Sequence, residues 1–165
     1  MGGCFLRFVL FALLTVGAGQ ASADEALTLP SIPLDKTAHY EFQFRLRHRQ
    51  NVMLSFWIHP WDGMSQRDSL THLQTVIEVS ITDHAGRIVC EAAGLIHDDG
   101  SIMRDRGMWI LDGSAESASL VNWNCSDIKL RRSELYALSI RIRDAGPSQT
   151  KVTLTPRLVS SEIGP

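Results

Sequence analysis

A repeated alternation of apolar and polar residues is the feature of this 165-residue sequence that most restricts its fold. In residues 39–50, HYEFQFRLRHRQ, one side of an extended chain would carry Tyr40, Phe42, Phe44 and Leu46. The other side would carry only polar and charged residues. Successive side chains of a β-strand point to opposite sides, so this period of two predicts a strand with one buried face.

The same period recurs along the chain, and turn-forming residues separate the repeats. The residues that share one side in the next three segments are Val52, Leu54, Phe56 and Ile58, then Thr75, Ile77, Val79 and Ile81, then Leu138, Ile140 and Ile142. About eight antiparallel strands follow from this layout, which predicts an all-β, single-domain sandwich of jelly-roll or immunoglobulin-like type.

Three local details of this sandwich can also be predicted. The bend at residues 49–51 would join the first two strands as a hairpin. Pro156 would mark an edge or terminal position, because proline cannot donate to a sheet. One segment, residues 63–73, lacks the period of two and predicts a short helical insertion that turns Leu70 and Leu73 inward.

The first 23 residues have the order of a secretory signal peptide. Arg7 precedes a short apolar run, and small residues end the segment at Ala21 and Ala23. The run is too short to cross a bilayer, which needs about 20 residues. Cys4 precedes the run, so it cannot become a lipid-modified N-terminus. We therefore expect cleavage after Ala23, a domain over residues 24–165, a periplasmic or secreted location and no stable membrane anchor.

Net charge bears on the class of partner, and cysteine content bears on disulfide formation. The chain has 16 basic and 18 acidic residues, and the single charge of the signal peptide is Arg7, so the processed chain stays slightly acidic. Nucleic-acid binders usually carry a basic excess, and no nucleic-acid partner is expected. Cys90 and Cys125 remain after cleavage, and an oxidising compartment favours a disulfide between them over two buried thiols.

Motifs of catalysis are missing from the sequence. It contains no G-x-S-x-G, H-E-x-x-H, Walker or C-x-x-C pattern, and its six histidines are scattered singly. We predict no enzyme, no metal and no cofactor, although a catalytic triad assembled from distant segments would leave no motif. Asp98, Asp99 and Asp105 offer oxygen ligands for calcium, but their spacing favours a solvated loop.

Two groups of residues are candidates for a binding surface. The first group consists of Trp57, His59, Trp61 and Asp62. Trp61 is the tryptophan expected to be exposed, whereas Trp57 could belong to the core or to the surface. The second group would share one surface if the strands that carry it were neighbours, and it consists of Arg45, Arg47, Arg49, Arg141 and Arg143. For these arginines the solvated side of a sheet is the favoured interpretation, with Glu41, Glu78 and Glu91 able to pair across strands. Trp109 and Trp123 lie in apolar segments and are predicted to be core residues.

Three segments give the chain a resemblance to the bacterial family filed as domain of unknown function 5625. These are the paired strands with the polar insertion that follows them, DHAGRIV at 83–89, and the late strand SELYALSIRI, in which Tyr136 follows a turn. The turn differs from that family in having Ser133, Glu134 and Leu135 where a glycine is usual, and many members are lipoproteins. The resemblance implies a fold and a compartment and no catalytic residues. With no motif of catalysis, we expect a protein-binding, immunity-like module; the alternative is a carbohydrate-binding module that uses exposed tryptophans.

Overall fold

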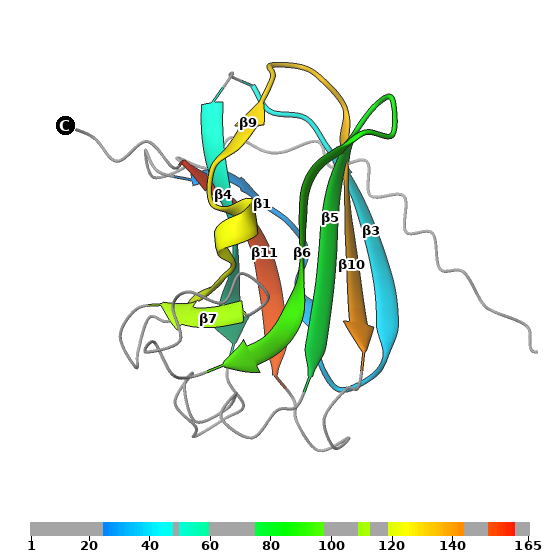
Figure 1. The fold of residues 1–165 in the computed structure, drawn as a ribbon, viewed down its shortest axis with the longest axis vertical. Helices are drawn as coiled ribbons and strands as arrows, with labels where there is room; N and C mark the ends of the chain where they lie inside the picture. Colours follow the sequence, from blue (N-terminus) through cyan, green and yellow to red (C-terminus); the bar gives the residue numbers. More distant parts are fainter. Residues whose placement is uncertain are drawn as a thin grey trace, which may run out of the picture.

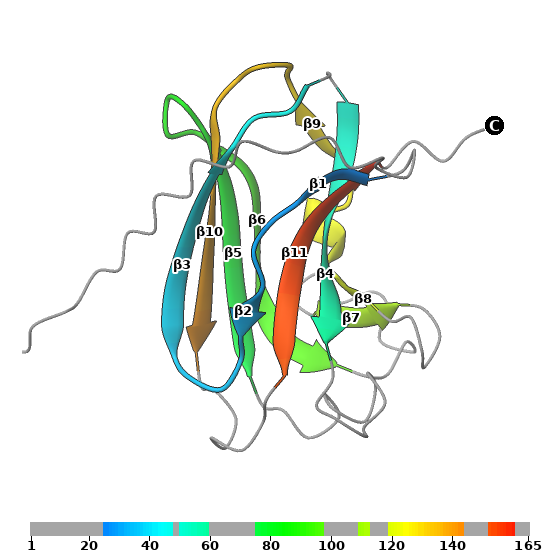
Figure 2. The same ribbon diagram turned by 180° about the vertical axis from the view of Figure 1, so that it is seen from behind.

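The structure, a computed structural model, describes residues 25–47, 50–59, 75–97, 109–112, 119–143 and 152–160. They form two antiparallel sheets that pack face to face, as Figures 1 and 2 show. The predicted all-β sandwich is therefore confirmed. The predicted signal peptide at residues 1–23 and the predicted helical insertion at 63–73 lie outside the described residues.

Each sheet combines strands that are distant in the sequence. The first sheet has the order β3 (Ala38–Phe44), β10 (Tyr136–Arg143), β5 (Val76–Asp83) and β6 (Ile88–His97). The second sheet has the order β1 (Glu25–Thr28), β11 (Thr153–Ser160), β4 (Gln50–His59) and β8 (Ser119–Val121), with β2 (Ile32–Pro33) beside β11 and β9 (Ile128–Leu130) beside β4. Strand β7 (Trp109–Asp112) pairs with β8 and, in parallel, with the end of β6.

The predicted apolar positions face the space between the sheets. On β4 every second residue is fully buried, and the same holds for the facing strands β5 and β10. Trp109 fills the core from β7, where it packs edge-on against Phe56 with ring centroids 5.1 Å apart. Its indole N–H donates to the backbone oxygen of Ile77 at 2.9 Å, which removes the cost of burying a polar group.

The hairpin predicted between the first two strands is wrong. β3 pairs with β10 in one sheet, whereas β4 pairs with β11, β8 and β9 in the other. The connection crosses the end of the sandwich, where Leu46 is buried and its oxygen accepts a hydrogen bond from the backbone N–H of Ser133. Both strands bury an apolar face in the same core from opposite sides, so their alternation is the same in either arrangement.

The expected edge position of Pro156 is also wrong, because β11 lies between β4 and β1. Strand β4 pairs with β11 without interruption past Pro156, so the missing N–H faces the other neighbour. On that side the oxygen of Pro156 accepts from the N–H of Leu29, and the partner strand is interrupted between β1 and β2. The interruption accommodates a proline inside the sheet.

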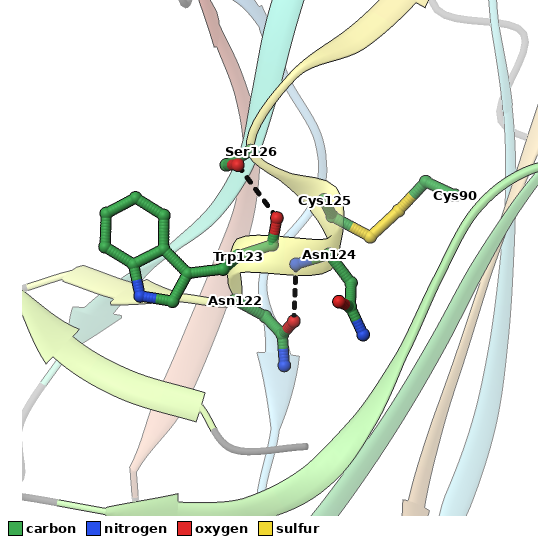
Figure 3. Close-up of a disulfide and its surroundings, with 6 residues drawn as sticks. All are labelled: Cys90, Asn122, Trp123, Asn124, Cys125 and Ser126. Carbon is green, nitrogen blue, oxygen red and sulfur yellow. Dashed lines mark hydrogen bonds between the residues drawn. A yellow bond between two sulfur atoms is a disulfide. The ribbon is translucent and has the colours of Figure 1, made fainter. Parts of the chain in front are cut away.

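A short 3₁₀ helix, η2 (Trp123–Cys125), connects β8 to β9. Its Cys125 is paired with Cys90 of β6, and their Cα atoms are 5.5 Å apart (Figure 3). The predicted disulfide thus joins strand β6 of the first sheet to the second sheet. Trp123 is 52% exposed, so its assignment to the core is wrong. The side chain of Asn122 accepts from the N–H of Asn124 and starts the helical turn, which directs Trp123 away from Cys90.

Candidate functional site

The outer side of the second sheet carries a compact group of aromatic, basic and hydroxyl side chains. We call this group the Trp57 surface, and it consists of Ser31, Trp57, His59, Thr155 and Arg157. Trp57 and His59 point outward because the intervening positions of β4 are committed to the core. The register places Thr155 directly opposite Trp57 on β11 and Arg157 opposite Ser55. Sequence segments about 100 residues apart thus build one surface.

Trp57 is 44% exposed and is the centre of this surface. The guanidinium carbon of Arg157 lies 5.2 Å from the centroid of the Trp57 ring, a cation–π distance. The ring of His59 lies 5.4 Å away on the other side along the strand and is tilted by 35°. The indole is held between two polar side chains while almost half of its surface remains open to solvent.

A chain of hydroxyl groups supports His59 from below. Its Nε2 atom is 2.7 Å from the Oγ1 atom of Thr155, which is 2.6 Å from the Oγ atom of Ser31. Thr155 is only 6% exposed, so these hydrogen bonds fix the imidazole on the sheet. The group therefore presents a pre-ordered aromatic and basic surface.

Two histidines contact hydroxyl groups as a catalytic base contacts its nucleophile, and neither completes a triad among the described residues. A triad needs an acid on the ring nitrogen that faces away from the nucleophile. His59 contacts Thr155 without an acid in the described part of the chain. His39 places Nε2 2.7 Å from the Oγ atom of Ser139, and Glu41 approaches that same nitrogen at 3.6 Å. The Glu41 carboxylate therefore lies on the same side of the ring as Ser139, where it cannot act as the acid of a triad.

The outer side of the first sheet has the solvated character predicted for it. Arg141 and Arg143 of β10 both contact Glu78 of β5, with N–O distances of 3.5 and 3.0 Å. Strand β3 does lie beside β10, yet Arg45 follows its opposite end, next to the residue paired with Tyr136. The arginine surface that neighbouring strands would have produced is thus split between two ends of the sheet.

Two acids organise the turns at the end of the sandwich that contains Arg45. The Asp83 carboxylate accepts hydrogen bonds from the backbone N–H groups of Arg87 and Ala85. It also forms an ion pair with the Arg87 side chain. These contacts lower the pKa of Asp83, and the backbone bond from Arg87 is the largest cause. Gly86, at φ +75°, supplies the left-handed residue of this turn, as DHAG predicts.

The second turn precedes β10. The Tyr136 hydroxyl accepts from the N–H of Arg131 at 2.8 Å and donates to Glu134 at 2.9 Å, and Glu134 also contacts His84. Burial is the main cause that raises the pKa of Tyr136. Ser133 has φ 61°, a left-handed conformation that favours glycine. Ser133, at the turn where a glycine would be expected, therefore has a strained backbone. The side chain of Arg45 donates a hydrogen bond to the Ser133 backbone oxygen.

Several predicted residues cannot be placed. Trp61, Asp62, Arg49 and the loop with Asp98, Asp99 and Asp105 lie outside the described residues. Within the described ranges no group of three or more His, Cys, Asp or Glu side chains could hold a metal. Those ranges also contain no helix with the length and apolar character of a membrane span. Sequence reasoning missed Ser31, Thr155 and Arg157; the alternation of residues 153–157 places Thr155 and Arg157 on one side, but only the pairing with β4 puts them beside Trp57.

No protein-family model matches this chain, and a search of curated proteins found no match. The chemistry of the described surfaces is therefore the basis for a functional proposal.

Proposed function

We propose that this chain is an exported, non-enzymatic module that binds another protein, as an immunity factor binds a toxin. The Trp57 surface carries this proposal. Tryptophan and arginine are the residue types most enriched among residues that dominate protein–protein binding energy. Trp57 lies on β4 and Arg157 on the neighbouring β11, and the inner side of each strand is part of the core, so little order has to be gained on binding.

Two further features support the export that this proposal assumes. The signal-peptide order of the first 23 residues predicts export, and the pairing of Cys90 with Cys125 is compatible with an oxidising environment. An immunity role adds the expectation of a toxin as the partner. Such a partner would cover the open part of Trp57 and replace the water around Arg157.

The carbohydrate alternative uses the same tryptophan differently. A sugar ring stacks its C–H groups on an open aromatic face. At Trp57 the Arg157 guanidinium lies over the ring and His59 lies beside it. Stacking would have to displace one of them, so the geometry favours a protein partner.

The test compares two exposed tryptophans. Full-length protein with a C-terminal tag would be produced in its host in three forms, wild type, Trp57→Ala and Trp123→Ala, cross-linked in the cell and analysed by quantitative mass spectrometry. Truncating a hot-spot residue costs about 2 kcal/mol or more of binding free energy. Trp57→Ala should therefore lower recovery of the partner about 30-fold. Trp123→Ala is the matched control and should leave recovery unchanged.

Other outcomes would contradict the proposal. Equal recovery with Trp57→Ala would exclude the Trp57 surface, and repeated recovery of no protein would exclude a protein-binding role. The same three forms should be applied to a glycan array. A glycan signal that disappears only with Trp57→Ala would replace the protein-binding function with the carbohydrate alternative.

A further inference from the structure

Four arginines meet where two loops cross at one end of the sandwich. Arg45 and Arg47 flank Leu46 after β3, and Arg131 and Arg132 follow β9. Leu46 and Arg132 form an isolated parallel bridge, and the N–H of Ser133 donates to the oxygen of Leu46 at 3.0 Å. We call these four residues the arginine bridge. The connection from β3 to β4 and that from β9 to β10 lie together at the top of Figures 1 and 2.

These arginines differ from the others that the structure describes. Each arginine outside the bridge has a charged or aromatic partner: Arg87 contacts Asp83, Arg141 and Arg143 contact Glu78, and Arg157 contacts the ring of Trp57. No carboxylate of the described residues forms an ion pair with a member of the bridge. All four side chains are exposed.

Two acids of the turns at this end, Asp83 and Glu134, are already engaged. Asp83 is saturated by Arg87 and by two backbone N–H groups. Glu134 accepts from Tyr136 and contacts His84. This end of the molecule therefore has a local excess of positive charge, although the chain as a whole has a net charge of −2.

The backbone under the bridge is held in place. Leu46 and Leu130 are 3% and 1% exposed, and they anchor the two segments in the core. The Tyr136 hydroxyl holds the N–H of Arg131, and Arg45 donates to the Ser133 oxygen. Four like charges held on fixed backbone repel one another, and the surface that carries them attracts anions.

We propose that the arginine bridge is a docking surface for an acidic segment of a partner protein. A guanidinium group presents a planar fork of donors that matches a carboxylate in a bidentate fashion. Several such groups on two fixed segments would bind successive Asp or Glu side chains. The attraction would also speed encounter with an acidic partner.

Two other polyanions fit the surface less well. Membrane binding by a basic patch usually adds an apolar side chain that enters the lipid, and the leucines of the bridge segments are buried. Single-stranded nucleic acid is bound by basic residues together with exposed aromatic rings. The aromatic residues described at this end, Phe44 and Tyr136, are stacked on each other and buried.

A matched pair of double variants tests this inference. Arg47→Gln/Arg132→Gln removes two charges from the bridge. The side chains of these two arginines make no described contact. Arg141→Gln/Arg143→Gln removes the same charge from the outer side of the first sheet. The probe is a fluorescent glutamate-rich peptide, with a glutamine-rich peptide as control, measured by anisotropy at low salt and at about 0.15 M ionic strength.

We expect the wild type to bind the glutamate-rich peptide and not its control. Binding should weaken about tenfold in Arg47→Gln/Arg132→Gln and no more than about twofold in Arg141→Gln/Arg143→Gln. Equal weakening in both variants, or no binding by the wild type, would overturn the proposal. Binding to phosphatidylglycerol vesicles without binding to the peptide would also overturn it and assign the bridge to a membrane.

The arginine bridge and the Trp57 surface share no residue. The peptide experiment therefore has an outcome independent of the cross-linking experiment with Trp57→Ala. Failure of the peptide experiment leaves the Trp57 surface standing, and equal recovery with Trp57→Ala leaves the arginine bridge standing.

Discussion

Phe56 and Trp57 are consecutive residues of β4 that face opposite sides of one sheet. Phe56 is fully buried and packs against Trp109, whose indole is itself hydrogen-bonded inside the core. Trp57 is 44% exposed, and its ring contacts Arg157 and His59 on the outer side of the sheet. Two large aromatic side chains in a row thus have different physical roles.

The difference extends to the inner and outer sides of the whole sandwich. Inner side chains from both sheets belong to a single packed cluster, so the loss of one leaves a cavity beside all its neighbours. Outer side chains form small separate groups such as Glu78 with Arg141 and Arg143, and a surface ion pair stabilises a protein by about 0–1 kcal/mol. The outer residues can therefore serve binding at little cost in folding free energy.

Substitution of the two neighbours gives the largest contrast. Phe56→Ala should lower the free energy of unfolding by about 3–5 kcal/mol, because it opens a cavity against Trp109. Trp57→Ala should lower it by about 1 kcal/mol or less, because it removes exposed area and one cation–π contact. Urea unfolding followed by circular dichroism measures both. Equal losses would show that the two sides of β4 are not energetically distinct.

The inner side of the molecule could be predicted well from sequence, for a physical reason. A strand turns every second side chain to the same side, so Val52, Leu54, Phe56 and Ile58 identify their buried face without knowledge of a partner strand. The hairpin between the first two strands could not be judged this way. Alternation is the same whether two strands share a sheet or face each other across the core.

The covalent link between the sheets gives the second contrast. Cys90 and Cys125 are 35 residues apart and almost fully buried. Replacing both by alanine should lower the free energy of unfolding by about 3–4 kcal/mol through the gain in chain entropy of the unfolded state. The melting temperature should fall by about 10 °C. An unchanged melt in scanning calorimetry would mean that packing alone holds the inner sides together.

The outer side was predictable only in part. The exposure of Trp57 was undecided because apolar residues flank it on both sides, and its environment depends on Arg157 from a distant strand. The prediction that Trp123 is a core residue is wrong for a different reason. A 3₁₀ turn replaces the strand that its apolar neighbours predict. Solvation of Arg141 and Arg143 was inferred correctly because alternation alone determines it.

The smallest contrast concerns the turn between β5 and β6, and it depends on pH. The pKa of Asp83 is lower in the folded chain than in the unfolded one, so its carboxylate stabilises the fold above the ordinary value of about 4. That contribution disappears as pH falls through the lowered folded value, because the protonated acid no longer pairs with Arg87. Asp83→Asn should therefore melt a few degrees lower than wild type at pH 7, with the two melting temperatures converging toward pH 2. Thermal melts of both proteins across this range provide the measurement, and the comparison cancels the titration of the other acids. A gap that stays constant with pH would assign the role of Asp83 to the shape of the turn and not to its charge.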